Sequence, residues 1–228
     1  LGGNDAAIVL PDVNVAEAAA KIYAGAFING GQTCAALKRL YVHESIYADM
    51  CQALAGIADS VVVGDGMDER SQLGPVQNKM QYDKVNQYLQ AALAQGGRAV
   101  TQSTQLPAQG YFIRPTIVAD VANSVALVQE EQFGPVLPVV AYQNLADALK
   151  MANGIEFGLG GSVWSQDLEA AQRVAAQMQT GTVWINGHAE VAPHAPFGGW
   201  KLSGLGCEFG MDGLLANTRQ KALHVYKN

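Results

Sequence analysis

Cys34 is the residue whose type and setting most clearly indicate chemistry in this chain of 228 residues. It ends the run Asn29-Gly30-Gly31-Gln32-Thr33-Cys34, which we interpret as a glycine-rich loop leading into a helix. A thiol at such a junction lies near the positive end of the helix and near backbone N–H groups, and both favour the reactive thiolate. The alternative is a small buried hydrophobe, which is what most free cysteines are. Cys51 lies on an apolar helical stripe and is predicted to be such a core residue.

A second cluster spans residues 129–136 and combines Glu130, Glu131 and Phe133 with a Gly-Pro turn before a predicted strand. Loops at the ends of strands are where α/β folds place ligands. The competing interpretation is a solvated acidic loop in which Phe133 packs as an anchor. The local pattern alone favours this second interpretation.

A third cluster, residues 196–210, is rich in glycine and carries Glu208. Repeated glycines indicate a backbone that needs unusual dihedral angles or approaches another group closely. The spacing fits neither the phosphate-binding pattern G-x-x-x-x-G-K-[ST] nor G-x-G-x-x-G after a strand. Taken alone, the cluster favours an irregular loop with Glu208 as a structural carboxylate.

The elements that must position these clusters alternate between apolar runs and helical patterns. Such alternation is typical of an α/β fold with a mainly parallel sheet and helices on both faces. We expect Ser45 to cap the second helix and Pro75 to open the third. Residues 222–226 form an isolated strand that is expected to pair outside the domain. The expected strands are residues 6–10, 38–43, 61–63, 113–118, 136–142, 161–164 and 182–185, and the expected helices are 15–27, 45–58, 75–93, 145–153 and 168–178.

Charge and hydropathy exclude two classes of partner. The formal net charge is −6, and the longest basic cluster is Lys38–Arg39, which is too short to follow a nucleic acid backbone. No apolar run approaches the ~20 residues that cross a bilayer. Neither a nucleic acid partner nor a membrane span is therefore expected.

The cysteines and histidines also argue against a metal site. The three cysteines show no Cys-x-x-Cys spacing and fit a reducing compartment, so a cytoplasmic location is expected. The four histidines lack the i, i+4 spacing of a helical metal pair, and we interpret them as non-catalytic. They are His43, His188, His194 and His224.

Together, the three clusters closely resemble the aldehyde dehydrogenase superfamily in order and spacing, over essentially all 228 residues. The resemblance implies the C-terminal catalytic portion of that family, a Rossmann-like α/β unit over residues 1–214. An oligomerisation segment over residues 215–228 would follow and contain the strand Gln220–Tyr226, and the cofactor-binding domain would lie upstream. The matching runs are Leu1-Gly2-Gly3, Gly31-Gln32-Thr33-Cys34, Glu130-Glu131-Gln132-Phe133-Gly134-Pro135-Val136, Asn153-Gly154-Ile155-Glu156-Phe157-Gly158-Leu159, Pro196-Phe197-Gly198-Gly199 and Ser203-Gly204.

By the same resemblance, Cys34 is the nucleophile that attacks an aldehyde carbonyl. The thiohemiacetal then transfers a hydride to the nicotinamide of NAD or NADP, and water hydrolyses the remaining thioester to a carboxylic acid. The residue type agrees with this chemistry, because a thiolate adds readily to a carbonyl and later leaves from a thioester. Nearby backbone N–H groups would hold the oxyanion.

The resemblance also implies contacts to the cofactor and a route for protons. Glu131 would bind the nicotinamide ribose with Phe133 packed close by, and the backbone carbonyl of Leu1 would bind the nicotinamide carboxamide. Glu208 would correspond to a carboxylate placed for proton relay to the catalytic site.

Substrate contacts and assembly follow from the same source. Phe197 and Val191 would line the substrate tunnel, and Thr33 would contact the substrate beside the nucleophile. An apolar tunnel favours aliphatic or aromatic aldehydes over highly charged ones. Because the family forms dimers or tetramers, self-association is expected.

Hydrolysis of the thioester is one of two branches that the sequence leaves open. In the family, a glutamate directly before Leu-Gly-Gly is the general base for hydrolysis, and that position falls before Leu1. We therefore expect the 228-residue chain to show no turnover by itself. Members that transfer the acyl group to coenzyme A can lack that glutamate, although Glu208 favours hydrolysis.

Two further alternatives are weaker. A catalytically silent structural member has no need to retain Cys34, Glu131 and Glu208 together, and nothing marks a dedicated thiol hydrolase. One departure from the family pattern is Asn4-Asp5-Ala6 in place of the frequent Lys-Ser-Pro. We expect this departure to touch no proposed role.

Overall fold

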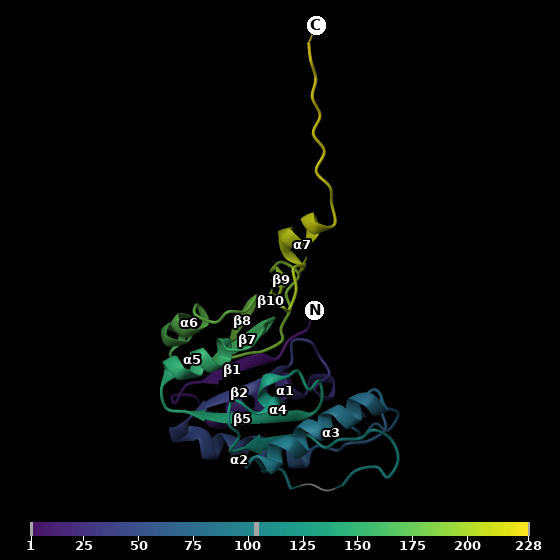
Figure 1. The fold of residues 1–228 in the computed structure, drawn as a ribbon, viewed down its shortest axis with the longest axis vertical. Helices are drawn as coiled ribbons and strands as arrows, with labels where there is room; N and C mark the ends of the chain where they lie inside the picture. The colour runs from purple at the N-terminus through teal and green to yellow at the C-terminus, as the bar shows by residue number, and fades with distance from the viewer. Residues whose placement is uncertain (1, 103–104, 228) are drawn as a thin grey trace.

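A seven-stranded sheet runs through the molecule in the order β3-β4-β5-β2-β1-β7-β8 (Figure 1). The computed structural model describes residues 2–102 and 105–227. Neighbouring strands run parallel throughout, except that the short edge strand β3 is antiparallel to β4. This confirms the predicted mainly parallel sheet. The strands are β1 (Asp5–Val9), β2 (Leu37–His43), β3 (Arg98–Ala99), β4 (Thr116–Ala119), β5 (Val136–Tyr142), β7 (Gly160–Trp164) and β8 (Thr182–Ile185).

Helices cover both faces of this sheet, as the alternating pattern predicts. The first two helices pack on one face and the next four contribute to the core on the other. The helices are α1 (Val15–Phe27), α2 (Glu44–Ser60), α3 (Lys79–Ala94), α4 (Ala126–Gln129), α5 (Leu145–Asn153), α6 (Leu168–Ala175) and α7 (Gly210–Ala216), together with a short 3₁₀ turn at Ile28–Gly31. Four short strands pair outside the main sheet, β6 (Phe157–Gly158) with β10 (Trp200–Lys201) and β9 (Phe197–Gly198) with β11 (Cys207–Glu208).

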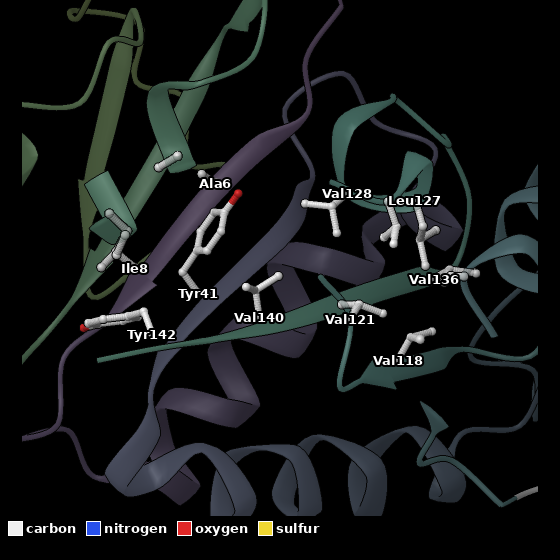
Figure 2. Packing of buried hydrophobic residues seen from close by; sticks show 14 of the residues in the cluster. Ala6, Ile8, Tyr41, Val118, Val121, Leu127, Val128, Val136, Val140 and Tyr142 are labelled. Atoms are coloured by element: carbon white, nitrogen blue, oxygen red, sulfur yellow. The ribbon is translucent and has the colours of Figure 1, made fainter. Parts of the chain in front are cut away.

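Strand residues divide between two hydrophobic clusters by alternation. In β1, Ala6 and Ile8 face one cluster and Ala7 and Val9 the other. Figure 2 shows Ala6, Ile8 and Tyr41 pointing into the first of these clusters. All five residues of β1 are buried, as expected for a parallel strand covered on both faces.

Two predicted helix starts are wrong, because a neighbouring polar side chain provides the cap. His43, not Ser45, precedes α2, and its Nδ1 accepts the N–H of Ser45 at 3.3 Å. Asn78 caps α3 by accepting the N–H of Gln81 at 2.9 Å. Pro75 lies in the loop before this cap, where its carbonyl accepts the amide of Gln32 at 3.3 Å. Contacts from another part of the chain hold this segment outside the helix.

The C-terminal segment extends away from the sheet after α7 (Figure 1). Residues 218–227 form no helix or strand in the described chain, so the strand expected over 222–226 is not formed within this molecule. Leu223, Val225 and Tyr226 are 82%, 77% and 88% exposed. An apolar segment with this exposure fits pairing outside the domain, which stays a prediction.

Candidate functional site

The residues singled out in the sequence gather at the amino edge of the parallel sheet. Cys34 lies just before β2, Glu131 and Phe133 lie before β5, and Gly3 lies before β1. Because these strands are adjacent and parallel, the loops that enter them meet at one edge. Ligands of open α/β sheets usually bind at the carboxyl edge. This candidate site is built at the opposite edge.

Cys34 lies in a turn, not at the start of a helix. The N–H of Ala36 donates to the carbonyl of Thr33 at 3.0 Å, and the chain then enters β2. The predicted loop-to-helix junction is therefore wrong, and with it the contribution of a helix dipole. Leu37 and the residues after it are buried between β1 and β5, and this tertiary burial outweighs the helix propensity of the preceding alanines.

The turn before Cys34 depends on left-handed backbone at Asn29, Gly30 and Gly31, whose φ angles are 51°, 66° and 73°. A Cβ on Gly31 would collide with the carbonyl of Gly134. The Nζ of Lys38 donates to that same carbonyl at 2.6 Å. The loop before Cys34 and the loop before β5 are thus held together at close range.

Lys38 and Arg39 are both buried, although the sequence marks them only as a short basic cluster. Burial lowers the pKa of Lys38 to about 7, and the nearby Glu131 charge opposes this shift. Arg39 donates to the backbone carbonyls of Asn4 at 2.7 Å and Ala152 at 2.9 Å. In the sequence, this burial is indicated only by the position of the two residues inside an otherwise apolar strand.

Glu131 contacts the glycine segment before β1. The N–H of Gly3 donates to its Oε1 at 3.2 Å, and Gly2 lies beside the same carboxylate. Lys84 donates to the backbone carbonyl of Glu131 at 2.8 Å. Two separate elements therefore hold Glu131 at the sheet edge, one through its carboxylate and one through its backbone.

The other two predicted cofactor residues are less defined. Phe133 is half-buried with a left-handed φ of 51°, and its carbonyl accepts the side-chain amide of Gln81 at 3.2 Å. Its packing against a cofactor stays a prediction. Leu1 lies outside the described residues.

A small pocket of about 210 Å³ lies beside the hydrophobic cluster against which Cys34 packs. Val191 and Phe197, the two predicted tunnel residues, line it together with Trp184 and Glu190. Trp184 and Cys34 both pack against the hydrophobic cluster that contains Phe197. The pocket and the thiol thus share the same apolar wall. The sequence does not single out Trp184 as a pocket residue. The feature that could have indicated it is an aromatic side chain in β8, the strand before the loop that carries Val191.

Two predicted site residues do not line this pocket. Glu208 is exposed in β11, where it pairs in antiparallel register with Phe197 of β9. Thr33 is half-buried beside Cys34 and is not among the residues that line the pocket. The structure therefore pairs the backbone of Glu208 with that of Phe197, while the proton-relay role of Glu208 stays a prediction.

The three cysteines differ in their surroundings. All are free, and Cys51 is buried, as predicted for a core residue. Burial raises the pKa of the Cys51 thiol to about 11. Cys34 and Cys207 are partly accessible. Of the two accessible thiols, Cys34 is the one beside the pocket wall.

Two features are absent from the part of the chain that the structure describes. No three His, Cys, Asp or Glu side chains within 2–102 and 105–227 lie close enough to hold a metal ion. In the same ranges, no helix is both long enough and apolar enough to span a membrane.

A family model described as the aldehyde dehydrogenase family matches residues 1–223. The chain belongs to the aldehyde dehydrogenase family. Among curated relatives, it is 40% identical over 227 residues to phenylacetaldehyde dehydrogenase from Pseudomonas fluorescens. That alignment covers 99% of this chain and 45% of the relative. It is 37% identical over 225 residues to a betaine aldehyde dehydrogenase from Cereibacter sphaeroides, covering 99% and 47%.

Solved aldehyde dehydrogenases have the same fold. The Mycobacterium tuberculosis enzyme, complexed with NAD⁺, superposes with a TM-score of 0.92 at 36% identity, over 97% of this chain and 46% of that one. An aldehyde dehydrogenase mutant from Pseudomonas syringae, complexed with NAD⁺ and octanal, gives a TM-score of 0.87 at 37% identity, over 93% and 44%. This chain spans less than half the length of these family members.

Proposed function

We propose that this chain carries the catalytic thiol of an NAD- or NADP-dependent aldehyde dehydrogenase that oxidises an aldehyde to a carboxylic acid. The observation that carries the proposal is the placement of three groups at one sheet edge. Cys34 shares an apolar wall with the pocket of Phe197, and the Glu131 carboxylate is fixed beside Gly3 in the adjacent loop.

The thiolate of Cys34 adds to the aldehyde carbon, forming a C–S bond while the carbonyl electron pair moves to oxygen. The oxyanion returns that pair as the hydride leaves the same carbon, and a thioester remains on Cys34. Water then attacks the thioester, the C–S bond breaks, and the acid and the free thiol are released. Each step uses the sulfur first as a nucleophile and later as a leaving group.

NAD or NADP would supply the hydride acceptor, and the residues present fit such a group. A carboxylate accepts hydrogen bonds from two ribose hydroxyls, and the Glu131 carboxylate is held at this edge by the N–H of Gly3, with Gly2 beside it. Phe133 follows in the same loop. The NAD⁺ complexes of two structural neighbours support the assignment.

We assign hydrolysis, not acyl transfer to coenzyme A, as the second half-reaction. Glu208 pairs in register with Phe197 across two short strands, so its backbone lies beside that of a predicted tunnel residue. Its exposure allows it to exchange protons with water. A carboxylate in this place suits proton relay to a hydrolytic water.

The pocket favours an uncharged aldehyde with an aliphatic or aromatic side chain. Trp184, Val191 and Phe197 supply apolar walls. The name of one relative, phenylacetaldehyde dehydrogenase, agrees with this class. We further propose a cytoplasmic dimer or tetramer that assembles through Gln220–Tyr226.

The test is absorbance at the band of the reduced nicotinamide, using the full-length protein that carries this chain. NAD, NADP and a small aldehyde panel are supplied, with and without coenzyme A, and Cys34→Ser is the control. We expect aldehyde-dependent reduction without coenzyme A and its loss in Cys34→Ser. Reduction that requires coenzyme A would replace hydrolysis by acyl transfer. No reduction under any condition would favour a silent member.

A further inference from the structure

Asp5 and His188 form a buried pair behind the nucleophile turn. His188 Nε2 lies 3.6 Å from Asp5 Oδ2, and the two side chains are 0% and 1% exposed. They come from the first strand and from the loop after β8, so the fold brings them together from opposite ends of the chain. Gly25 of α1 leaves space for the imidazole, because a Cβ there would lie 2.9 Å from His188 Cβ.

The imidazole is held in one orientation. Its Nδ1 lies 3.0 Å from Ser162 Oγ, which itself accepts the indole N–H of Trp164 at 3.0 Å. Its Nε2 lies 3.1 Å from the backbone carbonyl of Ala35. Since a carbonyl only accepts, Nε2 must carry the proton and donate it. Ala35 directly follows Cys34, so His188 holds the peptide next to the nucleophile.

Asp5 approaches the nucleophile segment from the other side. A Cβ on Gly3 would lie 2.5 Å from the carbonyl of Cys34 and 2.9 Å from Asp5 Oδ1, so only glycine lets these groups come so close. Asp5 Oδ1 accepts the N–H of Gly160 at 3.1 Å. A Cβ on Gly160 would collide with Asp5 Oδ2. Two glycines therefore make room for this one carboxylate.

The second carboxylate oxygen of Asp5 is buried without a hydrogen-bond partner. A buried polar atom of this kind costs free energy and calls for a compensating contact. The charged-type contact nearest to it is His188 Nε2, at 3.6 Å, which is beyond hydrogen-bond distance because the Nε2 proton is directed to the Ala35 carbonyl. The arrangement is thus a carboxylate aimed at an imidazole whose proton points to the turn of the nucleophile.

We propose that Asp5 and His188 are positioning residues for Cys34, with the carboxylate orienting the imidazole and the imidazole fixing the Ala35 carbonyl. Neither side chain contacts the aldehyde. The proposal rests on the proposed function, and it revises two expectations from the sequence. Asp5 belongs to the departure from the family pattern that was expected to touch no role, and His188 was interpreted as having no part in catalysis.

The test compares three variants of the full-length protein with the wild type. His188→Leu removes the N–H donor, His188→Gln keeps a donor at the end of the side chain, and Asp5→Asn removes the charge but keeps an oxygen for the N–H of Gly160. His194→Leu is the matched control, because His194 is exposed in the same loop. The readouts are kcat per titratable Cys34 thiol, KM for the aldehyde and Tm.

We expect His188→Leu to lower kcat about 10- to 100-fold, the range that a misplacement of about 1 Å costs, with KM changed less than about twofold. His188→Gln should recover most of the rate, Asp5→Asn should fall between, and His194→Leu should match the wild type.

An active wild type whose kcat is unchanged in His188→Leu would overturn the positioning roles alone. If His188→Leu does not fold, loss in Asp5→Asn with retention in His188→Gln supports the proposal, and any other pattern overturns it. An inactive wild type would instead overturn the proposed function.

Discussion

At the scale of single residues, the surroundings of each thiol decide its chemistry. Cys51 is buried in the core with a pKa raised to about 11, whereas Cys34 is partly accessible and packs against the hydrophobic cluster that contains Phe197. A thiolate, not a thiol, reacts with alkylating agents and carbonyls. The two cysteines should therefore differ in reactivity within one folded molecule.

We expect iodoacetamide at about pH 8 to alkylate Cys34 at least about tenfold faster than Cys51. The reasons are access and the small thiolate fraction of a thiol with a pKa of about 11. The measurement is a time course of labelled peptides under native conditions, with denatured protein as the control in which all three cysteines react. Equal native rates would contradict the assignment of Cys34.

Lys38 should make stability depend on pH. An ordinary lysine has a pKa of 10.5, whereas burial in the fold lowers the pKa of Lys38 to about 7. Between these values the unfolded chain binds more protons than the folded one, so the free energy of unfolding rises with pH. Relative to Lys38→Met, the wild type should gain up to about 1.4 kcal/mol per pH unit between about pH 7 and 10, and nothing below that window. Urea unfolding across this range measures the difference, and a difference that stays constant would show that Lys38 titrates normally.

At the scale of elements, regular apolar periodicity predicts the ranges of helices and strands well. Turns that depend on contacts with distant parts of the chain are not predicted. The ranges predicted for α1, α5, β5 and β8 agree with the structure, because their apolar spacing matches the burial that the sheet imposes. The turn at Cys34 was mistaken for a helix start, because the burial of β2 is not visible in the preceding alanines.

The motifs of the candidate site can be predicted from the sequence. The buried side chains that hold those motifs in place cannot. Cys34 and Phe197 stand out in the sequence as members of glycine-rich runs, and Glu131 as one of an acidic pair before a Gly-Pro turn. The burial of Lys38 depends on Gly134, which lies 96 residues away, and that of His188 on Asp5 at the other end of the chain. No spacing rule connects such pairs.

The variant Gly31→Ala tests how the loop before Cys34 is held in place. Gly31→Ala would strain a φ of 73° and drive a Cβ against the Gly134 carbonyl and to 2.7 Å from Lys38 Nζ. We expect a loss of stability of about 2 kcal/mol or more, together with a lower kcat. Gly56→Ala, in an exposed and open position of α2, should instead stabilise by up to about 1 kcal/mol. Chemical denaturation of both variants checks this, and equal effects would mean that the loop tolerates a Cβ.

At the scale of the whole molecule, the exposed C-terminal segment is the feature that a single copy leaves unexplained. Leu223, Val225 and Tyr226 expose apolar surface along a stretch that leads away from the sheet (Figure 1). We expect Leu223→Asp with Val225→Asp to convert the assembled full-length protein to smaller species in light scattering. The control pair, Lys221→Asp with Lys227→Asp, changes charge on the same segment without removing apolar surface. An unchanged mass in the first pair would place the interface elsewhere.

The chain also spans less than half the length of the relatives that it matches, and our proposal assigns the activity to the full-length protein. We expect the 228-residue chain produced alone to give no aldehyde-dependent reduction of NAD or NADP. A measurable rate from it would contradict that view.

The central claim is that Cys34 carries the acyl group of the substrate during turnover. The most direct measurement is peptide mass analysis of the full-length protein, quenched in acid during reaction with NAD or NADP and an apolar aldehyde. The account predicts an acyl adduct, lighter than the intact aldehyde by the two hydrogens lost, on the peptide that contains Cys34 and on no other. Reduction of the nicotinamide with the adduct on Cys51 or Cys207, or with no adduct on Cys34 at any time, would contradict it.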